Sequence, residues 1–229
     1  MVLTFLDQTT EPVGSGAVCE WLRHHGQLTS EATAGRFLRE LDHRGLTQRL
    51  GFRGRCLTPL GQSRLAELRR ERAVTASSSK LVDALRARDL DDLVEVLAAR
   101  RALEREIARL AALHATDEDL AVLEVLVRHY ETADPATVDG ADFAIHERMA
   151  AMAGNKVLQA ATRLIHDEAE AFPIPAALRR RLKPVLERQH RDLLEALRQR
   201  DADRAESVMI AHLDLLIESV QNHQRPRRR

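Results

Sequence analysis

From residue 80 onward, every long segment of the chain has apolar residues at the spacing of an α-helix. This periodicity constrains the fold more than any other feature, because it gives each helix one apolar stripe that must be buried. Aromatic residues make up only 3% of the chain, which favours helices over sheets. We therefore predict an antiparallel, all-α helical bundle. The expected helices are Lys80–Ala87, Leu90–Leu113, Asp117–Glu131, Gly140–Gly154, Val157–Ala171, Ala177–Arg200 and Ala202–Asn222.

Residues 1–72 have a mixed pattern with shorter segments. A helix is expected over Ser15–His25, and a second helix is expected from a capping serine, Ser30, to His43. The inward face of the second helix would consist of Phe37, Leu38 and Leu41. Two helices separated by a short turn are typical of a helix-turn-helix unit.

The run LTQRLGFRGRCLT follows these helices and predicts a β-hairpin. Two short segments flank a glycine-containing turn from Gly51 to Gly54. Pro59 then opens a helix that is expected to reach Arg72. The order of helix, helix, hairpin and helix is that of a winged helix-turn-helix, in which one helix enters the major groove of DNA and the hairpin contacts the flanking backbone.

The segment AVTASSSK, residues 73–80, divides the two parts. It is small and polar, with three serines in a row, and it indicates a linker or a helix boundary. The expected organisation is a winged-helix domain at 1–72, a linker at 73–80, an all-helical metal- and effector-binding domain at 81–222, and a basic, solvated tail at 223–229.

The charge of the whole chain is balanced, but its distribution is not. Residues 1–72 hold 11 arginines and no lysine against eight acidic residues, whereas the remainder holds 24 basic and 27 acidic residues. A basic first part permits binding to nucleic acid. Cys19 and Cys56 are too few for a disulfide framework. The N-terminal residues do not have the pattern expected of a signal peptide, and no apolar run of the length that a membrane span needs is found. A soluble, cytoplasmic protein is expected.

Polar residues share the apolar stripes of three expected helices. Asp142 and His146 stand four positions apart on one helical face, and His190 and His212 each share a stripe with aliphatic residues. Burying four titratable groups without partners is costly, and one divalent cation would satisfy all four. Imidazoles and a carboxylate suit zinc first, with nickel or manganese as alternatives. Periodicity alone leaves open that these are hydrogen-bonded core histidines.

The run ELDHRGLTQRLGFRGRCLTPLGQSRL resembles the winged helix of NrpR-type regulators, and the resemblance covers about residues 11–70. It implies that the helix from Ser30 to His43 is the recognition helix. Ser30, Thr33 and Arg36 would then meet DNA at its exposed end, and Arg53 and Arg55 would meet phosphate or the minor groove from the wing. The alternative for any single arginine is that it only makes the domain soluble.

The run DFAIHERMAAMAGN, from residue 142, resembles the Asp-x3-His…Gly-Asn signature of the FCD ligand-binding domain of GntR-type transcription regulators. ERQHRDLLEALRQRDADRAESVMIAHL resembles the C-terminal hallmark of that domain, and AARRALEREIARLAA, at 98–112, is similar to its early Arg-x3-Glu helix. This resemblance spans about residues 80–222. It implies an all-helical effector domain whose metal is held by Asp142, His146, His190 and His212. The Pro-x-x-Arg and Ala-Leu-x-x-Leu patterns of the usual GntR winged helix are absent.

The FCD resemblance also implies an effector, a small organic acid bound beside or on the metal. Arg100 matches a pocket arginine of the family, and Asn155 matches its asparagine. Each has a structural alternative, because Arg100 can pair with Glu104 within the helix and Asn155 can stop a helix.

Three hypotheses for the function follow. The first is a ligand-responsive DNA-binding regulator, a repressor that acts as a homodimer on a palindromic operator. The second is an enzyme in which the metal activates water or dioxygen, although no further acid–base pair is evident near the ligands and the winged helix would be unexplained. The third is a metal sensor, in which the ion itself is the signal.

Overall fold

The computed structural model describes residues 1–134, 138–169 and 174–224, and the chain divides into two compact units, Met1–Ser79 and Lys80–Arg229. Two expected features fall partly outside these residues. They are the basic tail, from residue 225 onward, and the end of the helix expected to reach Ala171.

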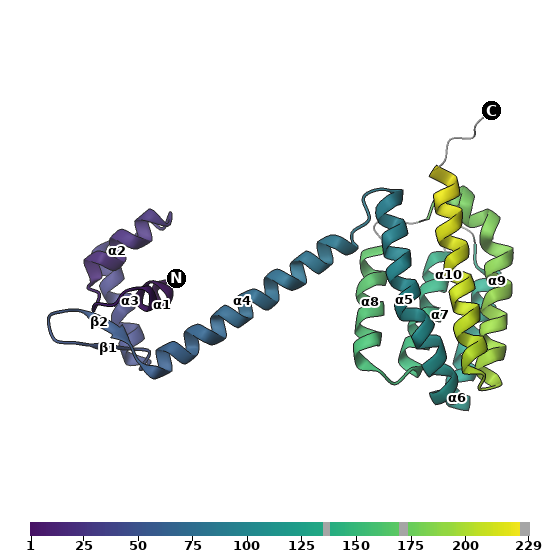
Figure 1. Cartoon of the computed structure of the whole chain (residues 1–229), viewed down its shortest axis with the longest axis horizontal. Helices are drawn as coiled ribbons and strands as arrows, with labels where there is room; N and C mark the ends of the chain where they lie inside the picture. The colour runs from purple at the N-terminus through teal and green to yellow at the C-terminus, as the bar shows by residue number, and fades with distance from the viewer. Residues whose placement is uncertain (135–137, 170–173, 225–229) are drawn as a thin grey trace. The chain divides into compact units, whose positions relative to one another are not determined.

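The first unit is a small helical domain with a two-stranded hairpin (Figure 1). Strands β1 and β2 pair antiparallel, with Thr47 opposite Leu57. Val18 and Leu38 are fully buried in its core. Its elements are α1 (Val2–Gln8), α2 (Ser15–His24), α3 (Glu31–His43), β1 (Thr47–Arg49), β2 (Arg55–Leu57) and the first part of α4 (Pro59–Leu85).

The inward face of α3 differs by one position from the sequence prediction. Ala34, Leu38 and Leu41 are buried, whereas Phe37 is 48% exposed. Positions 34, 38 and 41 follow the spacing of four and three residues that keeps side chains on one helical stripe. Phe37 lies beside that stripe, so its apolar character was a misleading guide to burial.

Close packing at Gly54 holds the hairpin against the rest of the first unit. Gly54 has a φ of +123°, and a Cβ atom at this position would overlap the backbone of Val13. Val13 forms an isolated antiparallel bridge with Arg55, with backbone hydrogen bonds in both directions. Only glycine combines this backbone conformation with so close an approach.

The helix boundary that the sequence indicated at residues 73–80 is wrong. The whole segment is helical and exposed, and it lies inside α4, which runs without a break from Pro59 to Leu85. The expected helix Lys80–Ala87 is therefore the last part of α4. The segment contains neither glycine nor proline, and alanine and lysine are good helix formers, so its small polar side chains do not stop a helix.

The second unit is the predicted helical bundle, with its helices arranged lengthwise beside one another (Figure 1). α5 packs against α7, α8, α9 and most extensively against α10, so it is the central helix. The bundle helices are α5 (Leu90–His114), α6 (Asp117–Thr132), α7 (Val138–Met152), α8 (Lys156–Ala169), α9 (Ala176–Arg198) and α10 (Ala202–Gln224).

Local signals in the sequence position these helices. Thr116 begins α6 with a capping box, in which its side chain and that of Asp119 each accept a hydrogen bond from the other residue's backbone N–H. At the turn between α9 and α10, Arg200 adopts a φ of +58°, and Asp201 accepts a hydrogen bond from the backbone N–H of Arg204 at 3.0 Å. This tight turn makes the two helices that carry His190 and His212 antiparallel neighbours.

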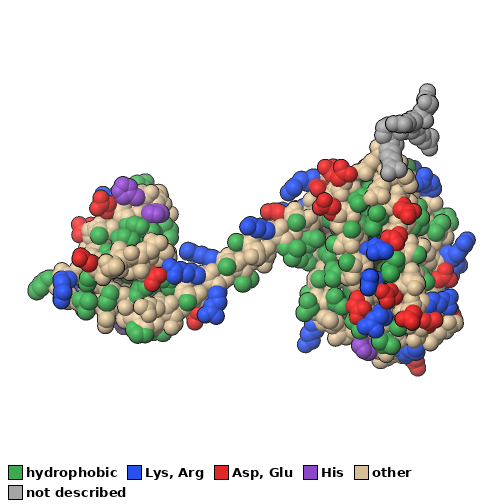
Figure 2. Space-filling model, in the orientation of Figure 1, with side chains coloured by type: hydrophobic (Ala, Val, Ile, Leu, Met, Phe, Trp, Pro, Cys, Tyr) green, Lys and Arg blue, Asp and Glu red, His purple; other side chains and the backbone are tan. Residues whose placement is uncertain are grey.

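Charges of both signs are interspersed over the visible face of the second unit (Figure 2). Within the described part of the chain, no helix combines the length and apolar character that a membrane crossing requires.

Candidate metal centre and DNA-binding unit

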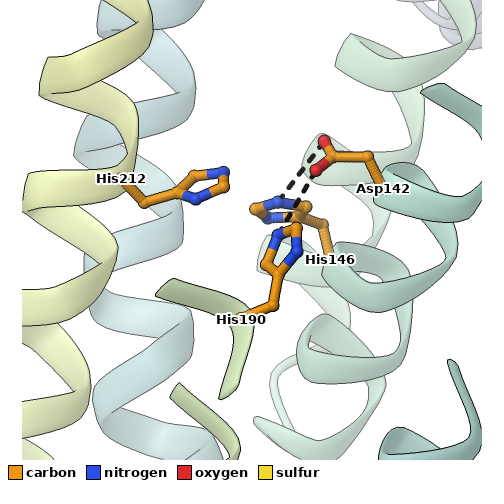
Figure 3. Close-up of side chains that lie close together, drawn as sticks. All are labelled: Asp142, His146, His190 and His212. Carbon is orange, nitrogen blue, oxygen red and sulfur yellow. Dashed lines mark ion pairs between the residues drawn. The ribbon is translucent and has the colours of Figure 1, made fainter. Parts of the chain in front are cut away.

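The four residues expected as metal ligands lie together inside the helical bundle. Helix α7 supplies Asp142 and His146, α9 supplies His190, and α10 supplies His212. Figure 3 shows the four side chains directed toward one region from these three helices. One ligand atom from each residue lies within 4.8 Å of all the others, so the structure brings the whole predicted set together.

The spacing of the ligand atoms fits a metal better than direct hydrogen bonds. His190 Nε2 is 3.3 Å from Asp142 Oδ1, and His146 Nε2 is 3.6 Å from Asp142 Oδ2. Good N–H···O hydrogen bonds are shorter, at about 2.7–3.2 Å. Ligand atoms about 2.1 Å from a tetrahedral zinc ion are about 3.4 Å apart. Each of the two imidazole nitrogens is therefore about as far from its Asp142 oxygen as two ligand atoms of one ion are from each other.

The histidine nitrogens of this cluster are buried, and none forms a hydrogen bond of regular geometry with the described residues, although Nδ1 of His146 is in close contact with Glu104. This holds for both ring nitrogens of His146, His190 and His212, whose residues are at most 1% exposed. A buried polar atom without a partner costs about 1–3 kcal/mol. Because the orphaned atoms face one another beside a carboxylate, a divalent cation would satisfy one nitrogen on each ring.

The environment sets different charge states on the three rings. Burial lowers the pKa of His190, and burial together with the neighbouring His190 holds the pKa of His212 well below its usual value. Burial opposes the charged form of His146 as well, but the carboxylates of Glu104 and Asp142 outweigh it and raise the pKa of His146 to about 9. Two rings are thus neutral at pH 7, as metal coordination requires.

A second layer of charged side chains surrounds the cluster. Arg100 and Glu104, both buried on α5, form an ion pair with Arg100 Nε 2.7 Å from Glu104 Oε1. Glu104 also contacts Nδ1 of His146 through its other oxygen. Arg100 Nη2 has no hydrogen-bond partner in the described part of the chain and lies 3.9 Å from Asp142 Oδ2. The intrahelical pair expected as the alternative for Arg100 is present, yet one guanidinium nitrogen remains available.

His166 is a site residue that the sequence interpretation missed. It is buried on α8, with Nε2 3.4 Å from Glu104 Oε1 and its ring stacked on Phe143 at 4.6 Å between centroids. It shares an apolar stripe with Leu158, Thr162 and Ile165, so the criterion that identified His190 and His212 would also have found it.

Comparison with known protein families now identifies the helical part. The FCD domain family matches residues 95–215, more than half of the chain. The chain belongs to the FCD domain family. A second match, to the ribonuclease R winged-helix domain, covers residues 1–65, so the FCD domain follows an N-terminal winged helix. This is the organisation of a GntR-type transcription regulator, as the motifs predicted, and it excludes the interpretation as an enzyme.

A curated relative supports the predicted resemblance of the first unit. The chain is 31% identical over 64 residues to the global nitrogen regulator NrpRI of Methanosarcina mazei. The matched region is 28% of this chain and 20% of the relative. The chain thus spans about a fifth of the length of that relative, and the similarity concerns the N-terminal region only.

Solved structures share the fold of this FCD-family chain. Streptococcus agalactiae GntR has a TM-score of 0.52 at 21% identity, over 92% of this chain and 90% of that one. The structure described as "Lar controls the expression of the Listeria monocytogenes agr system and mediates virulence" has a TM-score of 0.52 at 13% identity, with coverages of 89% and 84%. E. coli McbR/YncC has a TM-score of 0.50 at 14% identity, with coverages of 93% and 88%.

The winged helix presents three of the predicted DNA-contacting residues on α3. Ser30, Thr33 and Arg36 are exposed at its N-terminal end. Ser30 caps the helix by accepting a hydrogen bond from the Thr33 backbone N–H, and Arg36 donates one to the Thr33 hydroxyl at 3.3 Å. This polar row has the residue types that contact bases or phosphates, and its contact with DNA stays a prediction.

The two wing arginines predicted to meet DNA lie in different environments. Arg53 is exposed in the turn between β1 and β2. The side chain of Arg55 is only 13% exposed, and its Nε lies 2.7 Å from Asp42 Oδ2, whose other oxygen accepts a hydrogen bond from Thr47. The guanidinium of Arg55 therefore ties β2 to α3 within the domain, and its contact with phosphate or the minor groove stays a prediction.

Asn155 lies at the surface rather than among the metal ligands. It is exposed, and its side-chain oxygen accepts hydrogen bonds from the backbone N–H groups of Val157 and Leu158 at the start of α8. The structure therefore supports its role at a helix end, and contact with an effector stays a prediction.

Proposed function

We propose that this FCD-family regulator holds a divalent metal ion in its helical domain and changes its hold on DNA when a small organic acid binds there. The observation that carries the proposal is the buried cluster of Asp142, His146, His190 and His212, whose ring nitrogens form no regular hydrogen bond with the described residues. With three nitrogen ligands and one oxygen ligand, zinc is the first candidate, and nickel and manganese are alternatives.

A carboxylate effector is supported by Arg100. Its Nη2 is buried, forms no hydrogen bond with the described residues, and lies 3.9 Å from Oδ2 of the candidate ligand Asp142. A carboxylate can take an open coordination position on the ion and accept a hydrogen bond from this guanidinium. Arg100 is thus the candidate effector-binding residue that the geometry favours over Asn155.

The DNA-binding half of the proposal assigns α3 to the major groove and the β1–β2 wing to the flanking backbone. Ser30, Thr33 and Arg36 would contact the operator from α3, and Arg53 would contact phosphate from the wing. A homodimer acting as a repressor on a palindromic operator follows from the usual two-fold symmetry of such regulators.

Elemental analysis of purified variants tests the metal assignment. His190→Ala and His212→Ala should each lose most of the metal that the wild type retains, because each removes one of four ligands. His129→Ala is the matched control, since His129 is exposed on α6 and should leave the metal content unchanged. Full metal content in the two ligand variants would overturn the assignment.

Operator titrations then separate an effector-driven regulator from a metal sensor. With metal-loaded protein, a panel of small carboxylates should change both the DNA affinity and the melting temperature, since a bound ligand stabilises the fold that it binds. Arg100→Lys should reduce that shift, because lysine cannot reproduce the planar fork of arginine. DNA affinity that tracks the metal concentration and ignores every carboxylate would favour the sensor.

A further inference from the structure

Among the carboxylates in the described part of the chain that the proposed metal site does not use as ligands, Glu104 is the most buried. The residue is 2% exposed, on the central helix α5. Its carboxylate contacts three buried side chains, His146, Arg100 and His166. These three contacts indicate what the carboxylate does in the bundle interior.

The first contact joins Glu104 to a metal-ligand residue. Its Oε2 lies against Nδ1 of His146, while Nε2 of the same ring is the nitrogen 3.6 Å from Asp142. When an ion displaces the Nε2 proton of His146, the ring keeps its hydrogen on Nδ1, donates it to the carboxylate and coordinates through Nε2. Glu104 therefore selects the tautomer and ring orientation in which His146 can coordinate.

The other two contacts meet at the second oxygen of Glu104. Arg100 Nε lies 2.7 Å from Oε1, and His166 Nε2 lies 3.4 Å from the same atom. Both partners are buried, Arg100 on α5 and His166 on α8. One oxygen thus orients the arginine whose Nη2 lies near Asp142, and it also fixes α8 to α5.

We propose that Glu104 is a positioning residue of the metal centre, which holds His146 ready for the ion through one oxygen and aims Arg100 at the effector position through the other. This rests on the proposed function, because it requires that Asp142 and the three histidines hold a metal. Carboxylates that accept the second N–H of a metal-bound histidine generally fix the ring and strengthen its ligation. The contact with Arg100 adds a direct link between metal affinity and effector affinity.

Glu104→Gln, in the full-length protein, is the decisive variant, with Co²⁺ as the probe. The amide keeps the size of the side chain but loses the charge and one acceptor. We expect the Co²⁺ dissociation constant to rise roughly 10–100-fold, and the visible ligand-field bands of bound Co²⁺ to shift as His146 loses its fixed orientation. A residue with only a structural role would leave these bands unchanged.

Two further variants make the test independent of folding. Glu106→Gln is the matched control, because Glu106 is on the same helix but pairs with Arg109 at the surface, and it should bind Co²⁺ as the wild type does. Glu104→Asp keeps the charge beside Arg100 but shortens the reach to His146. If the glutamine variant does not fold, the aspartate variant should still fold and should still bind Co²⁺ more weakly than the wild type. Circular dichroism of the metal-free proteins verifies the fold.

The outcomes distinguish this inference from the function on which it rests. One outcome would overturn the role of Glu104 and leave the metal site intact. In that outcome the wild type binds Co²⁺, His190→Ala does not bind it, and the Glu104 variants have the same Co²⁺ affinity and ligand-field bands as the wild type. Wild-type protein without affinity for Co²⁺ or Zn²⁺ would overturn both.

Discussion

At the scale of single residues, His146, His190 and His212 are one residue type with the same burial but different charge states. The ring of His146 lies between Glu104 and Asp142. The rings of His190 and His212 are tilted by 39° with their centroids 4.9 Å apart, and His190 disfavours a positive charge on His212. The difference arises from which helix supplies each neighbour, because α5 brings Glu104 to one ring only.

These charge states predict a pH optimum for the stability of protein freed of metal by a chelator. Unfolded histidines titrate near pH 6.5, whereas folded His190 and His212 resist protonation. The unfolded chain then binds more protons, and stability is lost as pH falls below 6.5. His146 has a raised pKa of about 9. Its contribution to the free energy of unfolding is therefore fully present below pH 6.5 and is lost as the pH rises from 6.5 to 9.

Urea unfolding measures this profile. The free energy of unfolding of metal-free protein should be highest near pH 6.5, and His146→Asn should flatten the decline on the alkaline side alone. A wild-type free energy that rises steadily from pH 6.5 to 9, with no difference in the variant, would contradict the charge state assigned to His146.

At the scale of elements, the β1–β2 wing holds two arginines in different environments, and the sequence alone did not predict this difference. Arg53 is exposed, and Arg55 is engaged with Asp42. Arg53→Ala should weaken operator binding and reduce its salt dependence, because it removes one phosphate contact, while leaving the melting temperature unchanged.

Arg55→Ala should lower the melting temperature of the protein, because it leaves Asp42 partly buried without its cation.

Fluorescence anisotropy at several salt concentrations, together with thermal melts, checks both variants. If Arg53→Ala has no effect on DNA affinity, the wing is not a DNA contact. If Arg55→Ala melts as the wild type does, the ion pair with Asp42 contributes nothing to the domain.

The sequence predicted most helices correctly and missed features that depend on packing between elements. Periodicity located α5 to α10, because a buried stripe leaves a regular apolar pattern. It could not show that Val2–Gln8 is a helix, since seven residues are too few to distinguish a helix from a strand by period. Equally, the pairing of Arg55 with Asp42 joins residues 13 positions apart, and no local pattern records it.

The four candidate metal ligands could be predicted as a set, but their surroundings could not. Each ligand stands at an inward position of its own helix, so periodicity and the family motif identified all four. Glu104 entered the sequence interpretation only as a partner for Arg100. Its contact with His146 depends on how α5 packs against α7, which no local spacing determines.

At the scale of the whole molecule, the chain divides between Ser79 and Lys80, within a helix that has no break there. The separate hydrophobic clusters indicate that each unit has its own core. The four candidate metal ligands and Glu104 all belong to the second unit. A fragment of residues 80–229 should therefore fold and bind metal without the winged helix.

Calorimetric melting of this fragment, with and without Zn²⁺, tests the division. Metal at a free concentration of 100 times the dissociation constant should stabilise the folded fragment by about 2.7 kcal/mol, because the ion binds the folded state only. The increase in melting temperature should disappear in the same fragment with His212→Ala, which removes one ligand, and persist with His129→Ala. A fragment that is molten, or that binds Zn²⁺ much more weakly than the full chain, would mean that the first unit completes the bundle.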